Sequence, residues 1–149
     1  MILPASINKG SLMSGLRVLI AEDEVISRKL LHASLTKWGC QVVSAANAQA
    51  ACDALQAGGI DLCILDWEMP QMTGPEVCQW LRSSDLDQSY VILLTTKNQP
   101  EDIEAGYEAG ADDYMIKPFK GDDLRSRISE LAQRMPDAGC SAVWGQMTA

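Results

Sequence analysis

The chain has 149 residues, the usual size of one domain, and its hydrophobic content of 47% is sufficient for a buried core. Its formal net charge is −8 without any block of Lys and Arg, which argues against direct binding to nucleic acid. The five cysteines show neither a Cys-x-x-Cys motif nor metal-binding spacing with the single histidine, and they indicate a reduced, cytoplasmic protein. The sequence predicts neither a membrane span nor a signal peptide.

Both ends of the chain lack a periodic apolar pattern. We expect a flexible N-terminal arm at residues 1–15, a folded domain at 16–135, and a tail or the start of a linker at 136–149. Either the chain is a stand-alone protein or it is part of a longer one that carries an output domain.

Short apolar runs predict five buried strands, at residues 17–21, 41–45, 62–65, 90–94 and 113–116. Helical spacing of apolar residues predicts a first helix, on Ile26, Leu30 and Ala33, with Leu31, Leu35 and Trp38 beside them. Start signals predict four more helices, at the N-cap Asn47, at Pro75, at Pro100, and at the N-cap Asp122 or Asp123.

Strands and helices that alternate through short loops predict an α/β protein with a doubly wound parallel sheet, covered by helices on both faces. Ligands of such sheets bind beyond the carboxyl ends of the strands. Polar side chains follow four of the predicted strands there: Glu22 and Asp23, then Asp66, Thr95 and Lys117.

These residue types suit phosphoryl chemistry. Clustered carboxylates repel one another unless a cation neutralises them, and Mg²⁺ prefers such hard oxygen ligands. Asp66 can then attack phosphorus and form an acyl phosphate. Lys117 can pair with the phosphate, and Thr95 can donate a hydrogen bond to it. The polar set therefore predicts a phosphoacceptor aspartate beside a Mg²⁺ site.

Four stretches carry a family resemblance: Val18 to Glu24, Leu65 to Pro70 with Gly74, Leu94 with Thr95, and Gly110 to Phe119. Their order and spacing resemble the receiver domain of two-component response regulators of the chemotaxis-regulator type, over about residues 16–135. The resemblance implies a flavodoxin-like (βα)5 fold, a five-stranded parallel sheet of order 2-1-3-4-5.

The resemblance also implies roles at the site. Asp66 would be the phosphoacceptor. Mg²⁺ would be coordinated by Asp23, Asp66 and the backbone carbonyl of Glu68, with Glu22 acting through a metal-bound water. Thr95 and Lys117 would bind the phosphate.

A switch is implied as well. Tyr114 would turn inward when Thr95 moves toward the phosphate, although a half-buried core aromatic is the simpler interpretation of Tyr114. The Lys117–Pro118 peptide bond is expected to be cis. Phosphorylation would change the surface of the fourth helix, fifth strand and fifth helix.

The implied function is a phosphorylation-activated signalling switch, with no enzymatic activity beyond Mg²⁺-dependent autophosphorylation and autodephosphorylation. The phosphoryl donor would be a sensor histidine kinase or a histidine phosphotransfer protein. The target would be an output protein or a fused output domain, without direct contact to nucleic acid or membrane. His32 is interpreted as a surface or packing residue.

Two features depart from the family pattern. The helix from Pro100 to Gly110 carries acids without a Lys or Arg, where receivers that dimerise through this face usually supply basic residues. We therefore expect that dimer to be weak or absent, and a basic partner to bind instead. Glu68 lies two residues after Asp66, and Lys97 lies two residues after Thr95. We expect their side chains to face each other across the mouth of the site and to form an exposed ion pair, of order 0.2–1 kcal/mol.

Three other classes compete with this interpretation. A phosphatase of the haloacid-dehalogenase type needs a second aspartate where Glu68 stands. A flavodoxin-like binder needs a loop rich in Ser, Thr and Gly where Glu22 to Glu24 would repel phosphate. An interaction-only domain would not need the complete polar set.

Overall fold

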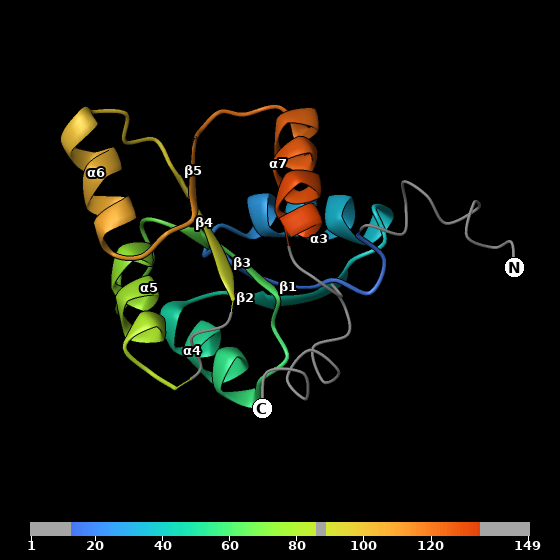
Figure 1. Ribbon diagram of the computed structural model, residues 1–149, viewed down its shortest axis with the longest axis horizontal. Coiled ribbons are helices and arrows are strands. Elements are labelled where there is room, and N and C mark those ends of the chain that lie inside the picture. The colour runs from blue at the N-terminus through green and yellow to red at the C-terminus, as the bar shows by residue number, and fades with distance from the viewer. Residues whose placement is uncertain (1–12, 86–88, 135–149) are drawn as a thin grey trace, which may run out of the picture.

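The computed structural model describes residues 13–85 and 89–134, and these form a five-stranded parallel sheet between two layers of helices (Figure 1). The strand order is β2-β1-β3-β4-β5, which confirms the predicted flavodoxin-like, doubly wound α/β fold. The elements in chain order are β1 (Arg17–Ala21), α3 (Val25–Lys37), β2 (Gln41–Ala45), α4 (Ala48–Ala57), β3 (Leu62–Asp66), α5 (Gly74–Arg82), β4 (Tyr90–Thr95), α6 (Pro100–Glu108), β5 (Asp113–Ile116) and α7 (Gly121–Arg134).

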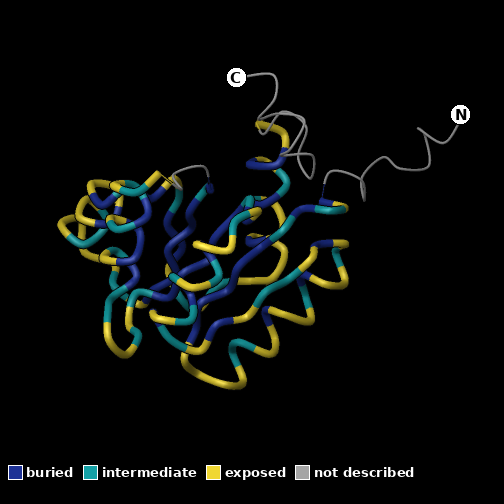
Figure 2. Tube along the Cα trace, turned by 90° about the horizontal axis from the view of Figure 1, so that it is seen from below, coloured by how far each residue is buried: buried dark blue, intermediate teal, exposed yellow. Residues whose placement is uncertain are grey.

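Alternate residues of a strand point to opposite faces of the sheet, so each face has a core of its own. Leu19, Leu65 and Leu93 belong to the core beneath α4 and α5, with Ile103 of α6 packed against it. Ile20 and residues on the same face of the other strands pack against α3 and α7. The central strands are therefore buried along almost their whole length, whereas the edge strand β2 is partly exposed (Figure 2).

Strands β3 and β4 each extend one residue beyond the predicted run, to Asp66 and Thr95. The two strands pair in parallel, and Asp66 stands opposite Leu94, the residue before Thr95. The ladder of backbone hydrogen bonds thus fixes a carboxylate and a hydroxyl at neighbouring strand ends.

The first helix forms as predicted, but the sequence did not decide which of its apolar faces is buried. Ile26 and Leu30 of α3 are 66% and 64% exposed, whereas Leu31 and Leu35 are buried against the sheet. Both pairs are spaced by four residues, so each forms a stripe along a helix. Periodicity alone did not distinguish the stripe that faces the sheet from the stripe that faces outward.

The start of the last helix also differs from the prediction. Helix α7 begins at Gly121, and Asp122 and Asp123 lie in its first turn instead of serving as the N-cap. Carboxylates there still stabilise the helix, because its first backbone N–H groups carry partial positive charge. Asn47 does cap α4, as predicted, by accepting a hydrogen bond from the Ala50 N–H at 2.8 Å.

The positions of Met13 and His32 bear on two expectations from the sequence. Met13, which we assigned to the flexible arm, is only 3% exposed and packs with Leu16 in the core, so the folded part reaches back at least to Met13. Residues 1–12 and 135–149 lie outside the described residues.

His32 is a surface residue whose Nδ1 lies 2.7 Å from the Ser44 hydroxyl. Across residues 13–85 and 89–134, no helix has the length and apolar character that a membrane crossing requires.

Gly74, the first residue of α5, is expected to be essential for packing at the end of β3. A Cβ atom at this position would lie 2.5 Å from the backbone oxygen of Asp66 and 3.1 Å from Leu93 Cδ2. Gly74→Ala should therefore lower the free energy of unfolding by about 1–3 kcal/mol, measured by urea denaturation. Gly121→Ala is the matched control, because nothing lies within 4 Å of a Cβ there, and it should change stability by less than about 0.5 kcal/mol.

Candidate functional site

Three carboxylates meet at the carboxyl ends of β1 and β3. Glu22 and Asp23 follow β1, and Asp66 ends the adjacent strand β3. Each offers an oxygen, and these oxygens all lie within 4.8 Å of one another. Glu22 is 2% exposed and Asp66 8%, whereas Asp23 is exposed. The cluster therefore opens to solvent on the Asp23 side.

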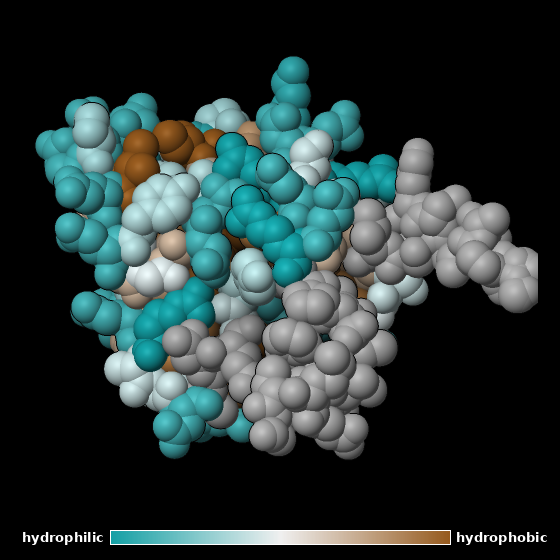
Figure 3. Space-filling model, in the orientation of Figure 1, coloured by the Kyte–Doolittle hydropathy of each residue, from teal (hydrophilic) through white to brown (hydrophobic). Residues whose placement is uncertain are grey.

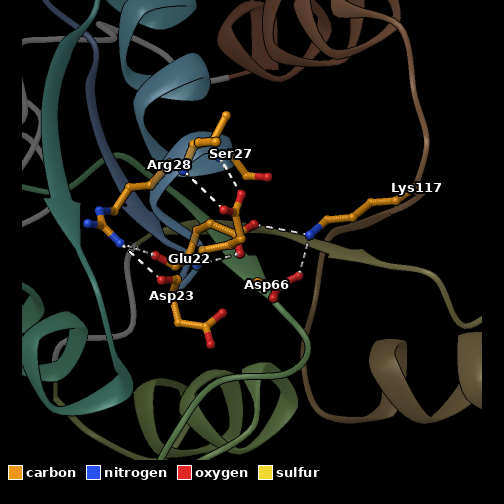
Figure 4. Close-up of polar contacts among 8 residues, drawn as sticks. Glu22, Asp23, Ser27, Arg28, Asp66 and Lys117 are labelled. Carbon is orange, nitrogen blue, oxygen red and sulfur yellow. Dashed lines mark hydrogen bonds and ion pairs between the residues drawn. The ribbon is translucent and has the colours of Figure 1, made fainter.

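The ammonium group of Lys117 neutralises part of this charge. Its Nζ donates to Asp66 Oδ1 at 2.7 Å and to Glu22 Oε1 at 3.0 Å, as Figure 4 shows. Burial disfavours the charged form of Lys117, but its hydrogen bonds to the two carboxylates raise its pKa above the usual value. The Lys117–Pro118 peptide bond is cis, as predicted, and the Lys117 N–H donates to the Thr95 carbonyl at 2.7 Å.

Burial raises the pKa of Asp66 to about 6. The hydrogen bond from Lys117 acts in the opposite direction, while the negative charges of Glu22 and Asp23 raise the pKa further. Lys117 therefore offsets only part of the cost that burial and the neighbouring negative charges impose on ionised Asp66. A divalent cation would relieve the rest, and three hard oxygen donors of this kind suit Mg²⁺.

The acidic turn after β1 has its own supports (Figure 4). The guanidinium of Arg28 donates to the backbone carbonyls of Glu22 and Asp23, at 2.9 and 3.3 Å. Glu24 caps α3, and its carboxylate accepts from the Ser27 N–H at 2.8 Å. We did not predict either role.

Thr95 and Tyr114 are connected through Lys97. Thr95 is 3% exposed, and its Oγ1 accepts a hydrogen bond from the Lys97 N–H at 3.0 Å. The Tyr114 hydroxyl donates to the Lys97 carbonyl at 2.9 Å, and the Tyr114 ring is buried. Gly106 of α6 gives this ring its space, because a Cβ there would lie 3.0 Å from two ring carbons.

The predicted ion pair between Glu68 and Lys97 is wrong. Lys97 Nζ lies over the ring of Trp67 instead, 5.6 Å from its centroid. Among the ion pairs of the described residues none joins Lys97 to Glu68, whose side chain is exposed and outside the acidic cluster. A cation–π contact at an exposed site contributes about 0.5–1 kcal/mol, as much as an exposed ion pair, so the neighbouring indole competes well for the ammonium.

The sequence itself matches the response regulator receiver domain family over residues 18–129. The transcriptional regulatory protein TcrA of Mycobacterium tuberculosis is 38% identical over 124 residues, which are 83% of this chain and 49% of TcrA. AfsQ1 of Streptomyces coelicolor is 38% identical over 117 residues, 78% of this chain and 51% of AfsQ1. The chain thus spans about half the length of the curated relatives it matches.

Solved structures agree with this match. The receiver domain of the Francisella response regulator 1452 superposes with a TM-score of 0.75 at 27% identity, covering 79% of this chain and 97% of that one. The chemotaxis protein CheY4 of Vibrio cholerae gives 0.73 at 28% identity, covering 79% and 98%. Fold, sequence match and strand-end polar residues together define the class: the chain belongs to the response regulator receiver domain family.

The raised pKa of Asp66 predicts a pH-dependent effect of replacing it. Between the ordinary pKa of 3.8 and about 6, the folded protein holds a proton at Asp66 that the unfolded chain releases. Ionising this carboxyl therefore costs folding free energy as the pH rises through that interval. Without Mg²⁺, the stability advantage of Asp66→Asn over wild type should grow from pH 4 to 6.5 and level off at about 1–3 kcal/mol.

Urea unfolding in EDTA at several pH values measures this advantage. Asp53→Asn is the control, because Asp53 is exposed on α4 and outside the cluster. It should show no comparable growth, and added Mg²⁺ should stabilise wild type but not Asp66→Asn. A stability difference between wild type and Asp66→Asn that stays constant from pH 4 to 6.5 in EDTA would contradict the raised pKa.

Proposed function

We propose that the protein is a phosphorylation-activated switch in which Asp66 accepts a phosphoryl group from a sensor histidine kinase or a histidine phosphotransfer protein. The observation that carries this proposal is the position of Asp66, beside Glu22 and Asp23 and 2.7 Å from the Lys117 ammonium. Such an arrangement serves a carboxylate that must become a nucleophile and then bear extra negative charge. We propose a cytoplasmic location for the same reason, because such a switch acts inside the cell.

Asp23, Asp66 and the backbone carbonyl of Glu68 would hold Mg²⁺, with Glu22 acting through a bound water. When bound, the ion would offset the charge of the carboxylates and of the incoming phosphoryl group. Asp66 forms the new O–P bond while the P–N bond to the donor histidine breaks. Lys117, already at Asp66 Oδ1, pairs with a phosphoryl oxygen, and Thr95 donates a hydrogen bond to another.

The switch would involve the contacts among Thr95, Lys97 and Tyr114. If the Thr95 hydroxyl turns to the phosphate, the segment that holds the Lys97 carbonyl moves with it, and this carbonyl is the acceptor for Tyr114. Phosphorylation then favours one of two positions of Tyr114 in an existing equilibrium. The protein would be an enzyme only in the limited sense of catalysing its own phosphorylation and dephosphorylation.

The surface formed by α6, β5 and α7 would be the output face. A groove of about 380 Å³ lies between β5 and α7 on this face, lined by Tyr114, Ile116, Pro118, Phe119, Ser126 and Arg127 among others. In Figure 3 an apolar patch beside α6 is surrounded by hydrophilic surface, and α6 contributes Glu101, Asp102, Glu104 and Glu108 without a basic residue. A segment with apolar and basic side chains would complement both features.

The donor protein would contact α3. Val25, Ile26 and Leu30 are 48%, 66% and 64% exposed, and Val25 comes directly after the acidic turn that carries Glu22 and Asp23. A donor histidine must come within bonding distance of Asp66, so its protein must cover the rim of the cluster. Burial of these apolar side chains would contribute binding free energy there.

Labelling with acetyl phosphate tests the phosphoacceptor. Wild type should become phosphorylated with Mg²⁺ and remain unlabelled in EDTA, as measured by a mass increase or by phosphate-affinity electrophoresis. Asp66→Asn should lose the label, because an amide oxygen is a poor nucleophile, whereas the control Asp53→Asn should retain it. Equal labelling of Asp66→Asn would overturn the proposed function.

Exposed residues of α3 separate donor recognition from chemistry. With a phosphorylated histidine phosphotransfer protein that labels wild type, Ile26→Ser and Leu30→Ser should reduce the transfer rate about 10-fold or more, because apolar area is lost from the contact. Labelling by acetyl phosphate should not change. Tyr107→Ser, which alters another exposed large side chain, on α6, is the control and should transfer at the wild-type rate.

The acidic α6 predicts the oligomeric state of the activated protein. Two copies that met through this face would bring like charges together, so the protein with Mg²⁺ and beryllofluoride should sediment as a monomer in analytical ultracentrifugation. A tight symmetric dimer that Tyr107→Glu dissociates would show that the face does pair with itself.

A further inference from the structure

The loop between β3 and α5, residues 67–73, is connected to helix α4 by a side chain. Oε1 of Gln71 accepts a hydrogen bond from the backbone N–H of Gln49 at 3.0 Å. Gln49 lies in the first turn of α4, where backbone N–H groups have no acceptor within the helix. Asn47 caps the neighbouring Ala50 N–H, so Gln71 provides a second cap from a distant part of the sequence.

The backbone at Gln71 adopts an unfavourable conformation. Its φ is +81°, the one positive value at a non-glycine residue among residues 13–85 and 89–134. The Met72 N–H donates to the Pro70 carbonyl at 3.0 Å, which closes a three-residue turn around Gln71. A residue with a Cβ adopts this conformation at a cost in free energy, so other contacts must hold it in place.

At the other end of the loop, backbone hydrogen bonds hold Trp67. The Trp67 N–H donates to the Leu94 carbonyl at 2.9 Å, and the Trp67 carbonyl accepts from the Gly74 N–H at 2.8 Å. Glu68, whose carbonyl is a proposed Mg²⁺ ligand, lies between this anchor and the turn at Gln71. The conformation of the loop at Glu68 therefore depends on both anchors.

We propose that Gln71 is a positioning residue for the Mg²⁺ site, which holds the loop that carries the Glu68 carbonyl through its bond to α4. The inference rests on the proposed function, because it requires that the acidic cluster binds Mg²⁺. Coupling between the two is reciprocal: if the Gln49–Gln71 bond favours the ion, the ion favours the bond by the same free energy.

Three substitutions at Gln71 separate the side-chain bond from the backbone. Gln71→Ala removes the acceptor. Gln71→Asn keeps an amide and tolerates positive φ better, but its side chain is one methylene shorter. Gln71→Glu keeps both the length and the acceptor oxygen. Gln56→Ala is the matched control, because Gln56 is an exposed glutamine at the other end of α4.

Mg²⁺ titrations of the unphosphorylated protein, followed by NMR of the backbone amides, measure the effect. Gln71→Ala and Gln71→Asn should bind Mg²⁺ about 3- to 10-fold more weakly than wild type, as loss of one hydrogen bond implies. Gln71→Glu and Gln56→Ala should bind within about 2-fold of wild type. Mg²⁺ should also slow hydrogen exchange of the Gln49 amide in wild type, but not in Gln71→Ala.

Two results would overturn the inference while wild type still binds Mg²⁺. One is unchanged affinity of Gln71→Ala. The other is unchanged affinity of Gln71→Asn, which would assign the effect to the backbone conformation instead of the side-chain bond. If wild type itself does not bind Mg²⁺, the proposed function fails, and this inference fails with it.

Discussion

The repulsion among Glu22, Asp23 and Asp66 is the constraint on which the rest of the site depends. Parallel strands β1 and β3 must bring these carboxylates together, because each stands at or just beyond the end of its strand. Lys117 offsets part of the repulsion, yet burial, together with the charges of Glu22 and Asp23, still raises the pKa of Asp66 to about 6. Allowing for solvent screening, a shift of this size corresponds to a cost of about 1–3 kcal/mol for ionising Asp66 in the folded protein. The fold therefore maintains an unfavourable charge arrangement that a cation or a phosphoryl group with its own contacts would change.

Lys117 also connects the charge cluster to the backbone of β4. Its side chain contacts Asp66 and Glu22, while its N–H bonds to the Thr95 carbonyl. Thr95 accepts from the Lys97 N–H, and the Lys97 carbonyl accepts from Tyr114. These hydrogen bonds form a continuous series from the cluster to the face of α6. Continuity gives a physical route for coupling, and its strength is measured by double-mutant cycles between Asp66 and Tyr114.

The strands and their terminal polar residues could be predicted from the sequence because burial leaves a strong signal. Runs such as Leu62 to Leu65 are apolar on both faces, and an acid at the end of such a run is conspicuous. Exposed long side chains leave a weaker signal in the sequence, because such a side chain can reach more than one partner. Lys97 was assigned to Glu68 from spacing alone, but the indole of Trp67 offered it another partner. The outward face of α3 was missed for a related reason, because both of its apolar stripes have helical period.

Contacts that depend on backbone shape could not be predicted from residue types. Nothing in the sequence marks Gln71 as a residue with positive φ, because glycine or asparagine usually fills such positions. Gly74 was noted only as part of a family motif, whereas its close approach to the Asp66 carbonyl gives the physical reason for a glycine there. Gly106 likewise became meaningful only when the Tyr114 ring was found against it. In each case the backbone conformation or the small size of one residue determines where a neighbouring group can lie. Strand ends place the charged groups of this site, and residues such as Gly74 and Gly106 let the neighbouring loop and α6 pack closely beside them.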